Sequence, residues 1–183
     1  MRTGTIETLD LDVIPYRPED LLALIEGAVE FHSSFGFPAA DGLREFLLGP
    51  EVAPDYIEML RGSTEADVWR HGFALVEKES KYVIGNAAFV GPPENGEVEI
   101  AYAIAPAFEG RGFATQATAA ITKIAFSYER VETVKAHTLP ERNASTRVLE
   151  KNGFRFASEI EHPIDGLIWR WDRARSSASS NSG

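Results

Sequence analysis

The hydrophobic positions of this chain change their period halfway along it, at its most informative stretch. Residues 97–105 form a short run of apolar and alternating side chains that Pro106 ends, which is typical of a strand covered on at least one face. Over residues 114–128, small and apolar side chains recur every three or four positions, as they do on one face of a helix. The pattern predicts a strand, a short loop containing Gly110 and Gly112, and a long amphipathic helix.

The rest of the chain shows the same two periods. We expect a strand over residues 5–16, a helix from Pro18 that Gly27 weakens or ends, a phenylalanine-rich loop over residues 31–38, short helices over 42–48 and 54–61, strands over 69–77, 82–90 and 132–139, a helix over 143–152, and a hairpin of 154–162 with 167–171. The strands on either side of the long helix should be parallel, because a helical crossover joins them. In the loop, Phe35 and Phe37 either cover the core or line a substrate cleft. The predicted fold class is α+β, with a mixed central sheet, flanking helices and a C-terminal hairpin.

Composition narrows the class of protein. The 183 residues are 44% hydrophobic and 25% charged, which is ordinary for one globular domain. We expect that domain over residues 1–175, with the serine-rich residues 176–183 as a disordered tail. No membrane span or signal pattern is recognised, and the absence of cysteine excludes disulfides and thiolate nucleophiles, so a cytoplasmic location is expected. A net charge of −10 argues against a nucleic-acid partner.

The glycine loop is a candidate anion site, because the backbone N–H groups at a helix start attract phosphates. A P-loop is excluded, since no Lys followed by Ser or Thr comes after the second glycine. A dinucleotide-binding loop needs a third glycine where Thr115 stands, although Glu129 and Glu132 lie near the expected ribose distance. A third pattern, Q/R-x-x-G-x-G/A, fits residues 109–114 except at its first position, Glu109.

That third pattern belongs to the GNAT superfamily of acetyl-CoA-dependent N-acetyltransferases, which this sequence resembles. Residues 98–117, VEIAYAIAPAFEGRGFATQA, are similar to the strand, loop and helix that hold the coenzyme A pyrophosphate there. Residues 144–154, ASTRVLEKNGF, are similar to the second signature of the branch that acetylates N-terminal amines of proteins, including ribosomal proteins. The resemblance implies a GNAT fold, in which the two parallel strands splay apart and admit the pantetheine arm.

The resemblance also implies which residues bind acetyl-CoA, the expected cosubstrate, with no metal. The backbone of Tyr102, Ala103 and Ile104 would pair with the pantetheine amides. The residues expected to hold the pyrophosphate are Gly110, Arg111, Gly112, Phe113, Ala114 and Thr115. Asn143 is a further candidate, one position later than the family's usual Asn, whose place is taken by Arg142.

The sequence departs from the family pattern at two other places. Leu149 stands where some relatives have a tyrosine acid, which excludes a phenol acid at that position. Glu109 adds a negative charge near the phosphates, although Arg111 can offset it.

The implied reaction is the direct attack of an amine on the thioester, which needs a proton acceptor and a stabilised thiolate. Glu99 is the candidate base, directly or through water, or else a structural strand carboxylate; His137 is the reserve. Ser145 is the candidate donor to the thiolate, or else a helix-start residue that bonds its own backbone. The family's bulged strand is expected to polarise the carbonyl through a backbone N–H. The four histidines show no metal-ligand spacing.

The sequence therefore predicts an N-acetyltransferase that moves an acetyl group from acetyl-CoA to a primary amine. The acceptor is a protein N-terminus or, as an alternative, a small-molecule amine. A second alternative is a regulatory module that binds coenzyme A with little or no turnover. No nucleic-acid or membrane partner is expected, and a homodimer is possible.

Overall fold

The computed structural model describes residues 3–49 and 54–176, and the strands in this part of the chain form one mixed sheet. Its eight strands, in spatial order, are β1 (Ile6–Glu7), β2 (Leu11–Pro15), β3 (Phe73–Glu77), β4 (Val83–Phe89), β5 (Glu97–Ile104), β6 (Thr133–Thr138), β8 (Gly166–Ala174) and β7 (Arg155–His162). Only β5 and β6 pair in parallel among them, and the other neighbours are antiparallel. The predicted α+β class with a mixed sheet is confirmed.

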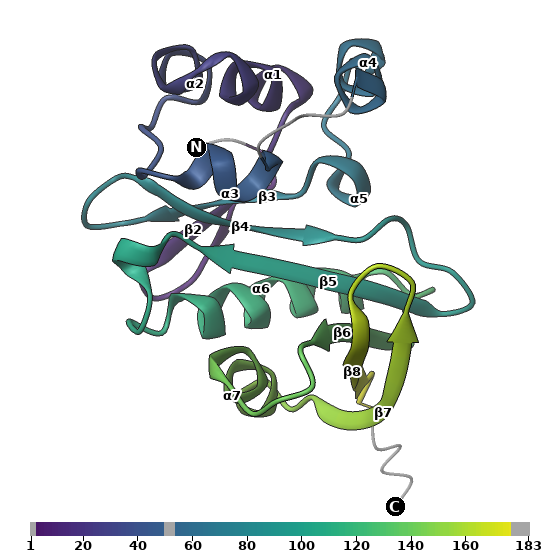
Figure 1. Ribbon diagram of the computed structural model, residues 1–183. Helices are drawn as coiled ribbons and strands as arrows, with labels where there is room; N and C mark the ends of the chain where they lie inside the picture. Colours follow the sequence, from purple (N-terminus) through teal and green to yellow (C-terminus); the bar gives the residue numbers. More distant parts are fainter. Residues whose placement is uncertain (1–2, 50–53, 177–183) are drawn as a thin grey trace, which may run out of the picture.

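The helices cover the two faces of this sheet unequally (Figure 1). The first layer contains α1 (Pro18–Glu26), α2 (Ala28–Phe35), α3 (Leu43–Leu48) and α4 (Pro54–Gly62), and its core cluster includes side chains of β2, β3 and β4. The second layer contains α6 (Phe113–Ser127) and α7 (Ala144–Lys151), and its core cluster extends across β2 to β6 and β8. On the face that the first layer covers, therefore, the helices pack against β2, β3 and β4. On the same face, β5, β6 and β8 carry polar side chains.

The side chains of strand β5 differ between the two faces of the sheet. Val98, Ile100 and Ile104 are buried against the α6 layer, whereas Glu97 and Glu99 lie on the opposite face and are partly exposed. Successive side chains of a strand point to opposite faces, so the alternation in the sequence fixes this division. The predicted alternation of β5 is confirmed, as is the long helix that follows it.

Three local predictions were wrong. Residues 5–16 form two strands instead of one, because the chain turns between Glu7 and Leu11. The expected loop over 31–38 is largely helix: α2 begins directly after Gly27, and Phe31 stacks on Phe35 within the core. Phe35 is 4% exposed, so it covers the core and does not line a cleft.

The third difference is at residues 69–71, which belong to the short helix α5 (Val68–His71) and not to a strand. The Asp67 side chain accepts a hydrogen bond from the N–H of Trp69 at 2.9 Å and caps this helix. Gly72 has a φ of 69° and leads into β3. The cap thus overrides a run of aromatic and charged residues whose pattern favoured a strand.

The C-terminal elements follow the prediction closely. Gly153, with a φ of 77°, follows the end of α7 in the left-handed conformation that glycine commonly adopts after a helix. The hairpin of β7 and β8 turns at residues 163–165 and ends the sheet. The side chain of Arg175 donates to the carbonyls of Phe126, Tyr128 and Val131, which fixes the chain near the proposed domain end. Residues 177–183 of the predicted tail lie outside the described residues.

Candidate active site

Strands β5 and β6 form a wedge that opens toward the C-terminal ends of the two strands. They pair at only three positions, Glu97–Glu99 with Thr133–Lys135. Beyond Glu99, β5 continues along β4 to Ile104, and β6 continues along β8 to Thr138, with no β5–β6 pair in the described ladder. We call the open part, between residues 100–104 of β5 and 136–138 of β6, the wedge. The splay implied by the family resemblance is therefore present.

The antiparallel ladder with β4 determines which backbone groups of β5 face this wedge. The N–H of Val90 donates to the carbonyl of Glu99, and the N–H of Ala105 donates to the carbonyl of Ile84. Because such bonds alternate along a strand, Ala103 directs its backbone groups toward β4, while those of Tyr102 and Ile104 face the wedge. Two of the three residues predicted to contact pantetheine thus have suitably directed backbone groups.

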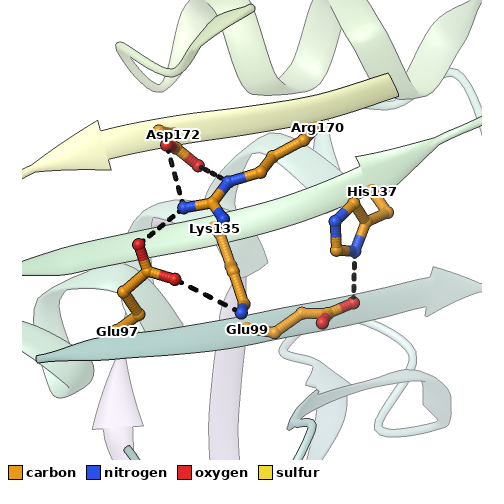
Figure 2. A network of polar contacts seen from close by, with 6 residues as sticks. All are labelled: Glu97, Glu99, Lys135, His137, Arg170 and Asp172. Carbon is orange, nitrogen blue, oxygen red and sulfur yellow. Dashed lines mark hydrogen bonds and ion pairs between the residues drawn. The ribbon is translucent and has the colours of Figure 1, made fainter. Parts of the chain in front are cut away.

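Glu99 and His137 meet at the closed end of the wedge (Figure 2). The Nδ1 atom of His137 lies 2.8 Å from Oε1 of Glu99, and their side chains are 23% and 26% exposed. Each strand supplies one partner, and both side chains lie on the face of the sheet opposite α6. The candidate base and its reserve, proposed separately from the sequence, therefore form one hydrogen-bonded pair.

A balanced ion network lies beside this pair (Figure 2). Glu97 contacts Arg170 at 2.7 Å and Lys135 at 3.4 Å, and Arg170 also contacts Asp172 at 2.7 Å. The hydrogen bond from Arg170, supported by Lys135, lowers the pKa of Glu97. Asp172 and Glu97 together raise the pKa of Arg170. The two carboxylates and two cations neutralise one another, and they join β5, β6 and β8 where the wedge closes.

The loop before α6 leaves its backbone donors exposed. Gly110 and Gly112 have φ values of 73° and 84°, a left-handed conformation that favours glycine. Gly112 is the N-cap of α6, and no side chain caps the helix there. A Cβ added at either glycine would meet no atom within 4 Å. The first N–H groups of α6 therefore have neither an intrahelical partner nor a side-chain cap.

The Arg111 side chain in this loop has a specific partner that the sequence did not reveal. Its guanidinium donates to the carboxylate of Glu77, at the end of β3, and lies 4.8 Å from the Phe113 ring. Glu77 is only 3% exposed and also accepts a hydrogen bond from Ser80. No spacing rule connects two residues 34 positions apart, so only the fold reveals this contact. The Arg111 side chain is thus directed to Glu77 in this structure.

The start of α7 lies across the wedge from β5. The phenol of Tyr102 donates to the backbone carbonyl of Ser145 at 3.3 Å, and burial raises the pKa of Tyr102 to about 12. Ser145 itself is exposed. Asn143 caps α7 through its side-chain oxygen, which accepts from the N–H of Thr146 at 3.1 Å. Of the two candidates for the family's Asn, Arg142 contacts Glu150 at 3.1 Å, and Asn143 has this capping role.

The bulge expected in the strand of the resemblance is absent from the described register. β5 pairs with β4 without a shift over Ile100–Ile104, and the sheet's register shifts lie at Leu75/Val76 and Phe156/Ser158 instead. Within the described ranges, no group of three or more His, Cys, Asp and Glu side chains is placed to hold a metal ion. In the same residues, no helix is long and apolar enough to cross a membrane.

The fold and the wedge together define an acetyltransferase scaffold, and comparison with known proteins agrees. The sequence model of the family described as acetyltransferase (GNAT) domain matches residues 11–155. The chain belongs to the GNAT acetyltransferase family. The glycine loop and the wedge both lie within the matched range.

Relatives and solved structures extend this finding. The chain is 30% identical over 108 residues to the uncharacterized N-acetyltransferase YjdG of Bacillus subtilis. The aligned region covers 57% of this chain and 62% of that protein. It is 30% identical over 125 residues to the uncharacterized N-acetyltransferase p20 of Bacillus licheniformis, with coverage of 67% and 65%. The chain thus spans less than two thirds of either relative. A structure of RimL, a ribosomal L7/L12 α-N-protein acetyltransferase in complex with coenzyme A, shares the fold with a TM-score of 0.65 at 12% identity, over 93% of this chain and 98% of that one.

Proposed function

We propose that this chain transfers an acetyl group from acetyl-CoA to a primary amine by direct attack. The observation that carries the proposal is the wedge between β5 and β6, with the Glu99–His137 pair at its closed end. A thioester that enters along the wedge would place its carbonyl beside a pair of groups that can accept a proton. Membership of the GNAT family supports the same reaction.

The open donors of the α6 start fit the pyrophosphate of the cosubstrate. Backbone N–H groups of Gly110, Arg111, Gly112, Phe113, Ala114 and Thr115 are the proposed contacts. The space where a Cβ would stand at Gly110 and Gly112 lets phosphate oxygens approach the backbone. The pantetheine arm would then pair with the wedge-facing backbone of Tyr102 and Ile104, as an added strand does. A fold relative is described in complex with coenzyme A, which supports this cosubstrate.

The reaction requires one proton transfer and one leaving group. The amine lone pair forms the new C–N bond at the thioester carbonyl, and the amine proton passes to the Glu99–His137 pair. The C–S bond then breaks, and the thiolate leaves and takes up a proton. Ser145 is the proposed donor to the sulfur. It lies at the start of α7, across the wedge from β5, and the Ser145 side chain is exposed.

The acceptor class is proposed as a protein N-terminus, with a small-molecule amine as the alternative. The family signature in residues 144–154 and the fold relative that acts on a ribosomal protein favour the first. A module that binds coenzyme A without turnover is the other candidate. It is favoured by Asn143, whose side chain is occupied in capping α7.

The test is acetyl-CoA consumption across a matched panel of amines. Peptides with free N-termini, the same peptides blocked at the N-terminus, and small polyamines would be compared by thiol release and by the mass of the product. We expect turnover with free N-terminal peptides and none with blocked ones. Turnover with polyamines alone would move the acceptor to the small-molecule class. Thermal protection by acetyl-CoA without turnover on any amine would support the regulatory module instead.

A further inference from the structure

We infer that His137 is the group that takes the proton from the attacking amine, and that Glu99 is a positioning residue acting through it. This assignment rests on the proposed function and deepens it. It reverses the order expected from the sequence, in which Glu99 was the base and His137 the reserve. The reason is the contact between the two side chains, which sequence reasoning could not show.

The contact fixes the tautomer of the imidazole. An ionised carboxylate only accepts hydrogen bonds, so the 2.8 Å contact between Oε1 of Glu99 and Nδ1 of His137 places the ring hydrogen on Nδ1. The other ring nitrogen, Nε2, then has a lone pair. No residue in the described part of the chain forms a hydrogen bond with Nε2. In Figure 2 this nitrogen is turned away from Glu99.

The chemistry of the two groups favours the imidazole as the base. A general base works best when it titrates near the working pH, and imidazole is the side chain whose ordinary range is nearest neutrality. The Glu99 oxygen that contacts the ring is already used as an acceptor. A carboxylate bound to Nδ1–H also stabilises the imidazolium that forms when Nε2 takes a proton. Glu99 thus has a defined role without touching the amine.

The other charged groups near His137 are paired with one another, so the ring is oriented by Glu99. The other charged groups of the network on this face are Glu97, Lys135, Arg170 and Asp172. Their ion pairs balance one another, and Arg170 lies opposite His137 in the β6–β8 register while bonded to Glu97 and Asp172. Within the described network, Glu99 is the carboxylate in contact with the ring. The amine proton therefore moves to Nε2, the ion pair with Glu99 holds it, and it then passes to the thiolate or to solvent.

A double-mutant cycle separates this arrangement from a glutamate base. His137→Gln, Glu99→Gln and the double variant would be assayed with an acceptor that wild type acetylates. We expect His137→Gln to lower kcat by about 10²- to 10⁴-fold and leave the KM for acetyl-CoA nearly unchanged. Glu99→Gln should cost less, and the double variant should match His137→Gln alone, because Glu99 acts only through the ring. An equal loss from Glu99→Gln in both backgrounds would overturn the assignment.

Chemical rescue provides a readout that a purely structural role would not change. Added imidazole should restore part of the kcat of His137→Ala and none of that of Glu99→Gln. His162→Gln is the matched control, because His162 also lies 2.8 Å from a carboxylate, Asp165, but at the end of β7, which β8 separates from β6 in the sheet. Its kcat should equal that of wild type. Failure of imidazole to rescue His137→Ala, in a variant that acetyl-CoA still protects thermally, would contradict the inference.

The failure of this inference is distinguishable from the failure of the proposed function. Wild type that binds acetyl-CoA but acetylates no amine would refute the proposed function, and this assignment with it. Wild type that is active, with His137→Gln retaining its full kcat, would refute the assignment of His137 alone.

Discussion

The starts of α6 and α7 are built in opposite ways, although the two helices pack against each other on the same face of the sheet (Figure 1). α7 begins with a closed cap: Asn143 accepts from the N–H of Thr146, and the Thr146 hydroxyl accepts from the N–H of Asn143. α6 begins at Gly112, which has no side chain to cap the helix. One helix start satisfies its own donors, and the other leaves them available.

This difference separates a structural helix start from a binding one. Unsatisfied N–H groups at a helix start carry a partial positive charge, so the open start of α6 suits an anion, whereas the closed start of α7 does not. α7 instead brings Ser145 toward β5 through the bond between Tyr102 and the Ser145 carbonyl. We therefore expect substitutions at α6 to change cosubstrate binding, and substitutions at α7 to change turnover or stability.

The largest expected effect is at Gly112. In Gly112→Asp, thermal protection by acetyl-CoA should disappear, because a carboxylate would occupy the space and oppose the charge of the pyrophosphate. Thermal melting with and without acetyl-CoA measures this protection. Gly166→Asp is the matched control: Gly166 also has a left-handed φ, 71°, and open space around an added Cβ, but it lies in the hairpin turn. Equal protection of both variants would mean that the α6 loop is only a turn.

Ser145→Ala should reduce turnover while the affinity for coenzyme A stays nearly constant. A hydroxyl directed at sulfur matters most as charge develops on the leaving thiolate, so its loss appears in the chemical step. We expect a decrease in kcat of about 10- to 1000-fold, the range for removal of one such donor. Single-turnover kinetics measure the chemical step directly, and an unchanged rate would leave Ser145 as an ordinary helix residue.

Arg111→Met should lower the free energy of unfolding by about 1–3 kcal/mol, because it leaves the buried Glu77 carboxylate without its cation. Urea denaturation measures this change. Adding Glu77→Gln to Arg111→Met should recover part of the loss. Arg142→Met is the control, since its ion pair with Glu150 is exposed and should contribute little. The same loss in both single variants would show that Glu77 does not depend on Arg111.

The sequence alone accounts for the strand, loop and helix of the glycine motif, because each has a strong periodic or glycine signal. The strand predicted for residues 69–71 was wrong, because a single helix cap at Asp67 outweighed their pattern. Contacts between segments far apart in the sequence had no local signal at all: neither the Glu99–His137 pair nor the Arg111–Glu77 pair follows from spacing. The motif thus locates the cosubstrate, while the chemistry between strands depends on register.

Asn143→Ala should cost about 1 kcal/mol of stability, the usual loss when a capping side chain is removed. Because the cap occupies the side-chain oxygen, we expect the affinity for coenzyme A to stay close to that of wild type. Urea denaturation and acetyl-CoA titration of the same variant compare the two effects. A large loss of affinity with little loss of stability would instead show that Asn143 reaches the pantetheine, as the family pattern suggests.

The smallest effect at neutral pH is expected for Tyr102→Phe, which removes the bond to the Ser145 carbonyl and should cost about 0.5 kcal/mol. Its pH dependence is more informative. Burial raises the pKa of Tyr102 from 10.0 to about 12, so the folded protein holds this proton more tightly than the unfolded chain. The resulting stability is fully present below pH 10 and is lost as the pH rises toward 12.

Wild type should therefore lose about 1–2 kcal/mol more than Tyr102→Phe between pH 10 and pH 12, after allowance for the partial exposure of the ring. Burial also raises the pKa of Tyr16 and Tyr56, but these two residues contribute equally to both proteins and cancel in the comparison. Urea denaturation at several alkaline pH values gives the two curves. The two curves should cross above pH 10, because the extra loss in wild type exceeds its advantage of about 0.5 kcal/mol at neutral pH. Parallel curves would show that the Tyr102 phenol is not shielded between β5 and the start of α7.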